Sequence, residues 1–182
     1  NVKAVNDFNL NLEEGEILAL LGSSGCGKTT TLRMIAGFEK ATSGEIKIGG
    51  KLVNDLKPSD RNVAMAFEGY ALYPPLTVRD NIAFSLMREK RSKEEVEAKV
   101  QEVSELLEIT NILERYPPSI SGGQQQRVSL ARALVRESEA LLLDEPMSQL
   151  EPQLRAVLRA RVKDYIQHNN KTVIFVTHDQ TE

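Results

Sequence analysis

A glycine-rich loop between an apolar run and a helical pattern constrains the fold of this 182-residue chain more than any other feature. The loop reads Gly22-Ser23-Ser24-Gly25-Cys26-Gly27-Lys28-Thr29 and matches the pattern G-x-x-x-x-G-K-[ST] at every fixed position. The run Ile17–Leu21 before it predicts a strand covered on both faces, and residues 29–36 after it predict a helix that ends at Gly37. Glycines let such a loop wrap closely, so its amides can point at phosphate oxygens from the start of the helix. The sequence therefore predicts a phosphate-binding loop.

The last residues of this loop have separate predicted roles. Lys28 supplies a positive charge for the β- and γ-phosphates of a nucleotide, and Thr29 offers its hydroxyl to Mg²⁺. Thr30 is included with the loop in the predicted nucleotide-binding set. The alternative is a plain turn between a strand and a helix, which the complete match to the pattern disfavours.

Two carboxylates follow the second apolar run, residues 141–143. Asp144 would hold Mg²⁺ through its water shell, while Glu145 points elsewhere and can polarise the attacking water. An Asp-Glu pair by itself is commonly only a polar strand end. The phosphate loop in the same chain makes the catalytic interpretation the stronger one.

Ser121, Gly122, Gly123 and Gln124 open a helix predicted to run to about residue 136. One interpretation is a capping box, with Ser121 as the N-cap and Gln124 at the third helical position. The other is a second anion site, because two glycines leave the start of the helix open to a phosphate. The two interpretations are compatible.

His178 ends the predicted strand 173–177. A single histidine at such a place is more often structural than catalytic. In a sheet that also carries a phosphate loop, however, it could donate a hydrogen bond to a γ-phosphate oxygen.

The order of apolar runs and helical patterns predicts an α/β fold. We expect a P-loop NTPase core with a mostly parallel sheet, an antiparallel β subdomain and an inserted helical subdomain. The core would comprise residues 1–73 and 137–182, and the helical subdomain residues 74–136. Within the core, Phe8, Leu10 and Leu12 predict a half-buried strand, and the Gly49-Gly50 pair predicts a hairpin.

Composition excludes several classes of protein. The net charge of −3 argues against a protein that coats nucleic acid, and we expect no nucleic-acid partner. No stretch approaches the roughly 18 consecutive apolar residues that a membrane span needs. The single cysteine, Cys26, excludes a disulfide framework.

Taken together, the phosphate loop, the run from Ser121 to Ala133, residues 141–146 and His178 resemble an ABC-type ATPase subunit. The segment 70–82 is similar to the subgroup that energises sugar and polyol importers of the maltose-importer type. The resemblance implies ATP and Mg²⁺ as cofactors and a head-to-tail dimer, formed with an identical or a homologous subunit. Each phosphate loop would then face the 121–124 segment of the other copy. It also implies integral membrane transport subunits as partners and a peripheral location on the cytoplasmic face of the cell membrane.

The chain departs from the family pattern at several positions. The family's lid-loop glutamine, which contacts Mg²⁺ and the transport subunit, falls at Glu68, so we predict catalytic and metal-binding roles for Glu68. The acidic residue of the family's Ser-x-Leu-Asp segment is Glu151. The adenine-stacking aromatic would lie before Asn1, and the chain stops four residues after His178, so we expect a fragment truncated at both ends.

The predicted function is that of an ATP-hydrolysing motor subunit of an importer. A nucleotide-gated clamp of the kind found in DNA repair or chromosome proteins is the alternative. Such clamps carry long coiled-coil or zinc insertions, whereas the block before Ser121 is short and lacks cysteine. A small-molecule kinase that shares only the phosphate loop is disfavoured by the run from Ser121 to Ala133.

Overall fold

The computed structural model describes residues 3–67, 69–87 and 89–178. The chain divides into two compact units, of which the first comprises Asn1–Met65, Ser138–Glu145 and Ile166–Glu182. The second comprises Ala66–Glu137 and Pro146–Tyr165. The subdomain boundaries inferred from the sequence stay a prediction.

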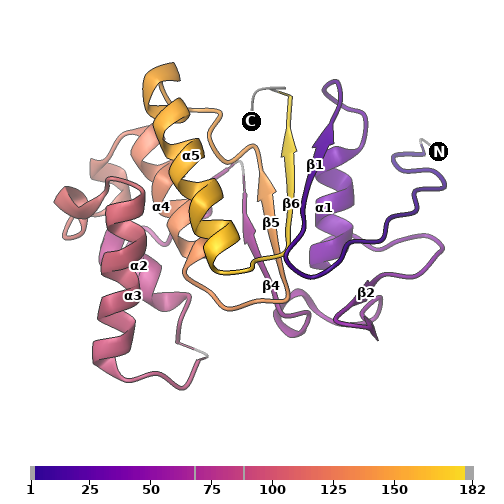
Figure 1. Cartoon of the computed structure of the whole chain (residues 1–182), viewed down its shortest axis with the longest axis horizontal. Coiled ribbons are helices and arrows are strands. Elements are labelled where there is room, and N and C mark those ends of the chain that lie inside the picture. The colour runs from indigo at the N-terminus through magenta and orange to yellow at the C-terminus, as the bar shows by residue number, and fades with distance from the viewer. Residues whose placement is uncertain (1–2, 68, 88, 179–182) are drawn as a thin grey trace. The chain divides into compact units, whose positions relative to one another are not determined.

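A sheet with parallel pairing forms the centre of the first unit (Figure 1). Within the described residues its strands are β1 (Ile17–Leu21), β6 (Val173–Thr177), β5 (Ala140–Asp144) and β4 (Val63–Ala66), in that spatial order. β6 pairs in parallel with both β1 and β5. The predicted core strands and the mostly parallel α/β arrangement are therefore confirmed.

Helix α1 (Lys28–Ala36) packs on one side of this sheet. Leu32 and Ala36 of the helix are buried against Leu142 and Ile174 of the strands. Alternate residues of β1 join this core, but the other face of β1 is open, and Leu21 is 54% exposed. The prediction that β1 is covered on both faces is wrong, because only the face that carries Leu18 and Leu20 packs on the core, while the alternate residues of the strand are exposed.

After α1, the strands β2 (Lys47–Ile48) and β3 (Lys51–Leu52) pair with each other in antiparallel orientation. This pair confirms the predicted hairpin. A short 3-10 helix, η1 (Pro58–Asp60), leads into β4. Phe8, Leu10 and Leu12 form no strand in the described structure. Leu12 packs on the core, while Phe8 and Leu10 stay exposed without a paired neighbour strand, so the predicted strand is wrong.

The second unit is mainly helical. Its helices are α2 (Val78–Phe84), α3 (Lys93–Leu106), α4 (Gly122–Leu134) and most of α5 (Pro152–His168), with the 3-10 helices η2 (Thr110–Ile112) and η3 (Pro117–Ser119). α2 packs against α3 and α4. Side-chain caps define where two of them begin, since Thr77 caps α2 and a capping box of Ser92 and Glu95 caps α3. In the part of the chain that the structure describes, no helix has the length and apolar character needed to cross a membrane.

Candidate functional site

The strand register brings three predicted site segments of the first unit to one edge of the sheet. Leu21 pairs with Thr177, and Asp144 pairs with Val176, so the residues that follow each strand are neighbours. The carboxyl ends of parallel strands are where ligands bind in α/β sheets. The phosphate loop, Glu145 and His178 therefore share this edge (Figure 1).

Gly27 shows why the loop requires glycine. Its φ of 96° lies in the left-handed region, and a Cβ there would lie 2.3 Å from the carbonyl oxygen of Ala4. α1 begins at the next residue, and no side chain within the described residues caps this end. The phosphate-binding role of this loop stays a prediction, and the first-turn amides of α1 are the groups that would contact an anion there.

The ammonium of Lys28 folds back over the loop. Its Nζ atom donates hydrogen bonds to the carbonyl oxygens of Gly22, at 2.7 Å, and Ser23, at 2.8 Å. It also lies 3.7 Å from Sγ of Cys26. The loop backbone therefore holds the charge of Lys28 above the loop without any carboxylate partner among the described contacts of this ammonium.

A hydrogen bond joins Thr29 to Asp144 at the carboxyl ends of the strands. The Thr29 hydroxyl donates to Oδ1 of Asp144 at 3.0 Å, and Asp144 is buried. Hydroxyl and carboxylate oxygens are the hard ligands that Mg²⁺ prefers, and Mg²⁺ usually takes only one or two carboxylates together with substrate phosphates. The residues present fit Mg²⁺.

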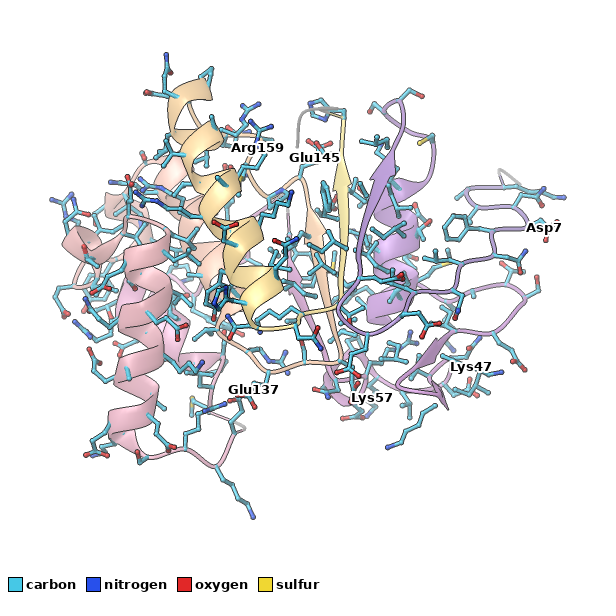
Figure 2. The ribbon with its side chains drawn as sticks, viewed as in Figure 1. Asp7, Lys47, Lys57, Glu137, Glu145 and Arg159 are labelled. Carbon is cyan, nitrogen blue, oxygen red and sulfur yellow. The ribbon has the colours of Figure 1, made fainter. Side chains whose placement is uncertain are left out.

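Glu145 and His178 meet directly. Nδ1 of His178 lies 2.9 Å from Oε1 of Glu145, and the Glu145 side chain is only 21% exposed. Figure 2 shows Glu145 at the carboxyl end of the strands. Glu145 has a φ of 47°, and its amide donates to the carbonyl of Val176 at 2.9 Å. Non-glycine residues held at positive φ are costly and concentrate at functional sites. Glu145, the candidate base, is therefore one of the described non-glycine residues with such a backbone.

The 121–124 segment lies in the second unit. The capping box is confirmed, because Ser121 Oγ accepts from the Gln124 amide and Gln124 Oε1 accepts from the Ser121 amide. A Cβ at Gly123 would lie 3.2 Å from the carbonyl oxygen of Gln149. Close packing is therefore a structural reason for one of the two glycines, and the anion-binding role of this segment stays a prediction.

Sequence reasoning missed Gln126. This side chain is buried, donates to Ser148 Oγ at 3.1 Å and accepts from the Gln149 amide at 2.9 Å, so it fixes the segment after β5 against α4. The only signal in the sequence is its place one helical turn after Gly122 and Gly123. Glu68, the predicted metal ligand, lies outside the described residues. Glu151 precedes α5 and is exposed.

Comparison with known proteins agrees with this geometry. The family model described as ABC transporter matches residues 5–148. The trehalose import ATP-binding protein SugC of Mycobacterium tuberculosis is 50% identical over 179 residues, which cover 98% of this chain and 46% of that protein. The trehalose/maltose import ATP-binding protein MalK of Thermococcus litoralis is 50% identical over 187 residues, covering 100% of this chain and 50% of that protein. The chain thus spans about half the length of the curated relatives it matches.

A solved structure gives the same result for the fold. A dimeric ATP-binding cassette in a post-hydrolysis state, bound to ADP and Pi, matches with a TM-score of 0.88 at 33% identity. The match covers 98% of this chain and 81% of that chain. The predicted P-loop ATPase fold is confirmed.

Proposed function

The chain belongs to the ABC transporter family, and from this premise we propose that it is the ATP-binding and ATP-hydrolysing motor subunit of an importer. The solute would be a sugar, a polyol or a related molecule. The names of the relatives support this class, since they include trehalose and maltose import proteins and an sn-glycerol-3-phosphate import protein.

One observation carries the hydrolytic part of the proposal. The Thr29–Asp144 pair and the Glu145–His178 pair lie at the carboxyl ends of the neighbouring strands β1, β6 and β5, next to the phosphate loop. Phosphoryl transfer needs a phosphate cradle, oxygen ligands for a metal and a residue that positions water. These residues would supply all three requirements.

ATP would enter against the phosphate loop and the first turn of α1. The amides of this turn and the ammonium of Lys28 then contact the β- and γ-phosphates. Lys28 must exchange its bonds to the Gly22 and Ser23 carbonyls for phosphate oxygens, so it is held close to its place of action before ATP binds. Gly22, Ser23, Ser24, Gly25, Cys26, Gly27, Lys28, Thr29 and Thr30 form the proposed phosphate-binding set.

Glu145 is the proposed general base. Its carboxylate accepts a proton from water as the water oxygen bonds to the γ-phosphorus and the bond to the ADP oxygen breaks. Nδ1 of His178 lies 2.9 Å from Oε1 of Glu145, and in the imidazolium form Nδ1 would donate to Glu145 while Nε2, on the far side of the ring, would donate to a γ-phosphate oxygen. Thr29 and Asp144 would hold Mg²⁺, which neutralises charge on the phosphate oxygens when bound.

We propose a head-to-tail pair with an identical or homologous subunit, in which Ser121, Gly122, Gly123 and Gln124 of each copy reach the nucleotide of the other. The dimeric state of the structural neighbours supports this pairing. Integral membrane transport subunits complete the proposed complex, with this protein peripheral on the cytoplasmic face.

Steady-state hydrolysis tests the proposal. The protein with ATP and Mg²⁺ should release phosphate, and a metal chelator should abolish the release. Glu145→Gln should keep ATP bound while turnover falls by about 10²- to 10⁴-fold, because it removes the base and spares the phosphate contacts. Hydrolysis by Glu145→Gln at the parent rate would show that another group is the base.

A further inference from the structure

The segment 69–73 of the second unit has an unusually constrained backbone. Tyr70 and Ala71 both have positive φ, 62° and 46°, although neither is glycine. The Ala71 amide donates to the Gly69 carbonyl at 2.8 Å, which closes a γ-turn of the rare positive-φ kind around Tyr70. Such a conformation persists only where surrounding contacts impose it.

Arg132 of α4 supplies one of those contacts. Its Nη1 atom donates to the carbonyl oxygen of Ala71 at 2.5 Å, and its guanidinium carbon lies 4.8 Å from the centre of the Tyr73 ring. Its Nε atom is buried and has no partner within the described residues. Burial lowers the pKa of Arg132, so the cation is held in a place where its charge is costly.

Asn81 of α2 anchors the other end of the segment. This side chain is fully buried, accepts from the Tyr73 amide at 2.8 Å and donates to the Tyr73 carbonyl at 3.0 Å. The backbone is therefore fixed at Tyr73 by Asn81, and the strained turn just before it depends on Arg132.

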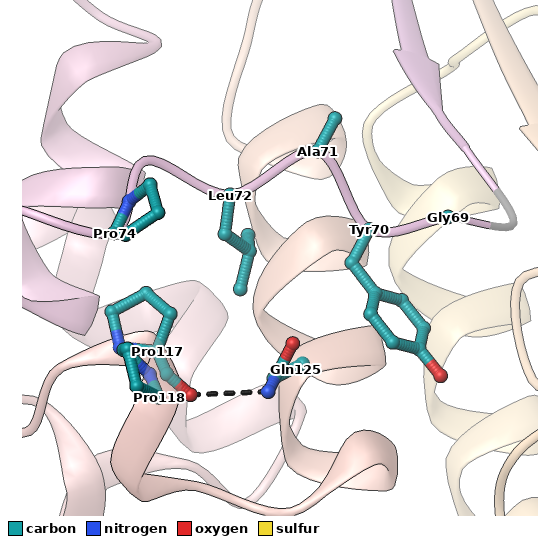
Figure 3. Close-up of a pocket in the computed structure, with 8 residues that line it drawn as sticks. All are labelled: Gly69, Tyr70, Ala71, Leu72, Pro74, Pro117, Pro118 and Gln125. Carbon is teal, nitrogen blue, oxygen red and sulfur yellow. Dashed lines mark hydrogen bonds between the residues drawn. The ribbon is translucent and has the colours of Figure 1, made fainter.

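The segment also reaches the start of α4. A Cβ at Gly122 would lie 3.5 Å from the Tyr70 hydroxyl oxygen, so the tyrosine lies beside the glycine pair. Figure 3 shows Tyr70, Leu72 and Gln125 around an open pocket of about 340 Å³ that the segment borders. In the sequence the segment follows Glu68, for which we predict a metal contact.

We propose that Arg132 is a positioning residue for ATP hydrolysis, which holds the 69–73 segment in its strained left-handed conformation against the start of α4. This role rests on the proposed function, because it assigns a consequence for turnover. Loss of the Arg132 contact lets Tyr70 and Ala71 relax to ordinary φ values and moves the residues on either side. Nucleotide binding is spared, because the phosphate loop belongs to the first unit.

The first test does not depend on hydrolysis. If Arg132 imposes positive φ on Ala71, then Ala71→Gly should raise the equilibrium constant for folding about fivefold, since glycine adopts this conformation without strain. In the Arg132→Met background the same change should bring no gain, because the segment is already relaxed. Equal effects of Ala71→Gly in both backgrounds would overturn the strained-segment part of the proposal.

Hydrogen exchange locates the change. Arg132→Met should speed exchange of the Ala71 amide by about tenfold or more, while the Tyr73 amide stays protected by Asn81. Arg127→Met is the matched control, since Arg127 lies on the same helix, has a buried Nε without a partner in the described residues, and donates to the Leu107 and Glu108 carbonyls. Unchanged exchange at Ala71 in Arg132→Met would overturn the contact's role.

The second test measures turnover. Arg132→Met should lower kcat by about tenfold or more with ATP affinity within about threefold of the parent, whereas Arg127→Met should keep the parent kcat. Should Arg132→Met fail to fold, Arg132→Lys keeps a donor but loses the flat guanidinium. It should lower kcat less than Arg132→Met does and keep the parent affinity for ATP. Faster Ala71 exchange with parent kcat would refute the positioning role. An inactive parent would instead refute the proposed function, and the exchange and folding measurements would still decide whether Arg132 holds the segment.

Discussion

The guanidinium of Arg61 occupies the space in which a side chain at Gly37 would begin. A Cβ at Gly37 would lie 2.5 Å from Nε of Arg61, and Gly37 ends α1 with a φ of 88°. Arg61 is 4% exposed and donates to four backbone carbonyls, two of them, those of Met34 and Ile35, in the last turn of α1. The helix that starts at the phosphate loop is thus held at its far end by a buried cation, which suits the negative end of a helix dipole.

Loss of this cation should destabilise the first unit. We expect Arg61→Met to lower the free energy of unfolding by about 2–4 kcal/mol, because four partly buried backbone carbonyls lose their donor at once. Denaturant unfolding measures the change. Arg33→Met is the control, since Arg33 lies on the same helix in an exposed ion pair with Glu39 and should cost less than about 1 kcal/mol. A loss for Arg61→Met no larger than that of the control would contradict the role of Arg61.

Lys28→Ala should weaken ATP binding. The loss of charge-assisted bonds to phosphate predicts an affinity lower by roughly 10- to 150-fold. Fold stability should change little, because the contacts of the ammonium within the described residues are two carbonyls of its own loop and the Cys26 sulfur. Calorimetric titration with ATP, paired with thermal unfolding of both proteins, separates the two effects. An ATP affinity of Lys28→Ala equal to that of the parent would show that Lys28 does not contact the phosphates.

Tyr165 makes the second unit sensitive to alkaline pH. Burial, with nearby Glu102 and Glu137, raises the pKa of its phenol from 10.0 to about 12. Below pH 10 the phenol is protonated in both folded and unfolded chains, so it adds no pH dependence. Between pH 10 and 12 only the unfolded chain releases the proton, so stability falls as pH rises. Thermal unfolding of the parent and of Tyr165→Phe should therefore show a difference in Tm that shifts in favour of Tyr165→Phe across this window and is constant below it.

Glu68 is predicted from the sequence to ligate Mg²⁺ when nucleotide is bound. A carboxylate attracts the hard cation more strongly than the carbonyl of glutamine, but it repels the γ-phosphate. Glu68→Gln should therefore need more Mg²⁺ for half-maximal hydrolysis and turn over faster at saturation. The alternative is that Glu68 faces a basic patch on the transport subunit. An unchanged Mg²⁺ requirement together with an unchanged rate would favour that alternative.

The sequence by itself determined the chemistry of the first unit. The Gly22–Thr29 pattern is local, and so are the apolar runs that end at Leu21, Leu143 and Thr177, because a strand, a turn and a helix start each depend on a few consecutive residues. From these the phosphate loop, the parallel sheet and the carboxylates at a strand end could all be predicted. The capping box at Ser121 is local in the same way.

Only the tertiary structure decided which distant residues meet. No spacing in the sequence states that Leu21 pairs with Thr177 and Asp144 with Val176, yet that register brings Glu145 to His178. The same is true of the half-buried Arg132 that holds Ala71, and of β1, whose apolar residues could not reveal that only one of its faces is covered. Periodicity reports which residues of one element share a face, whereas pairing and burial depend on elements far apart in the chain and are set by the packing of the whole unit.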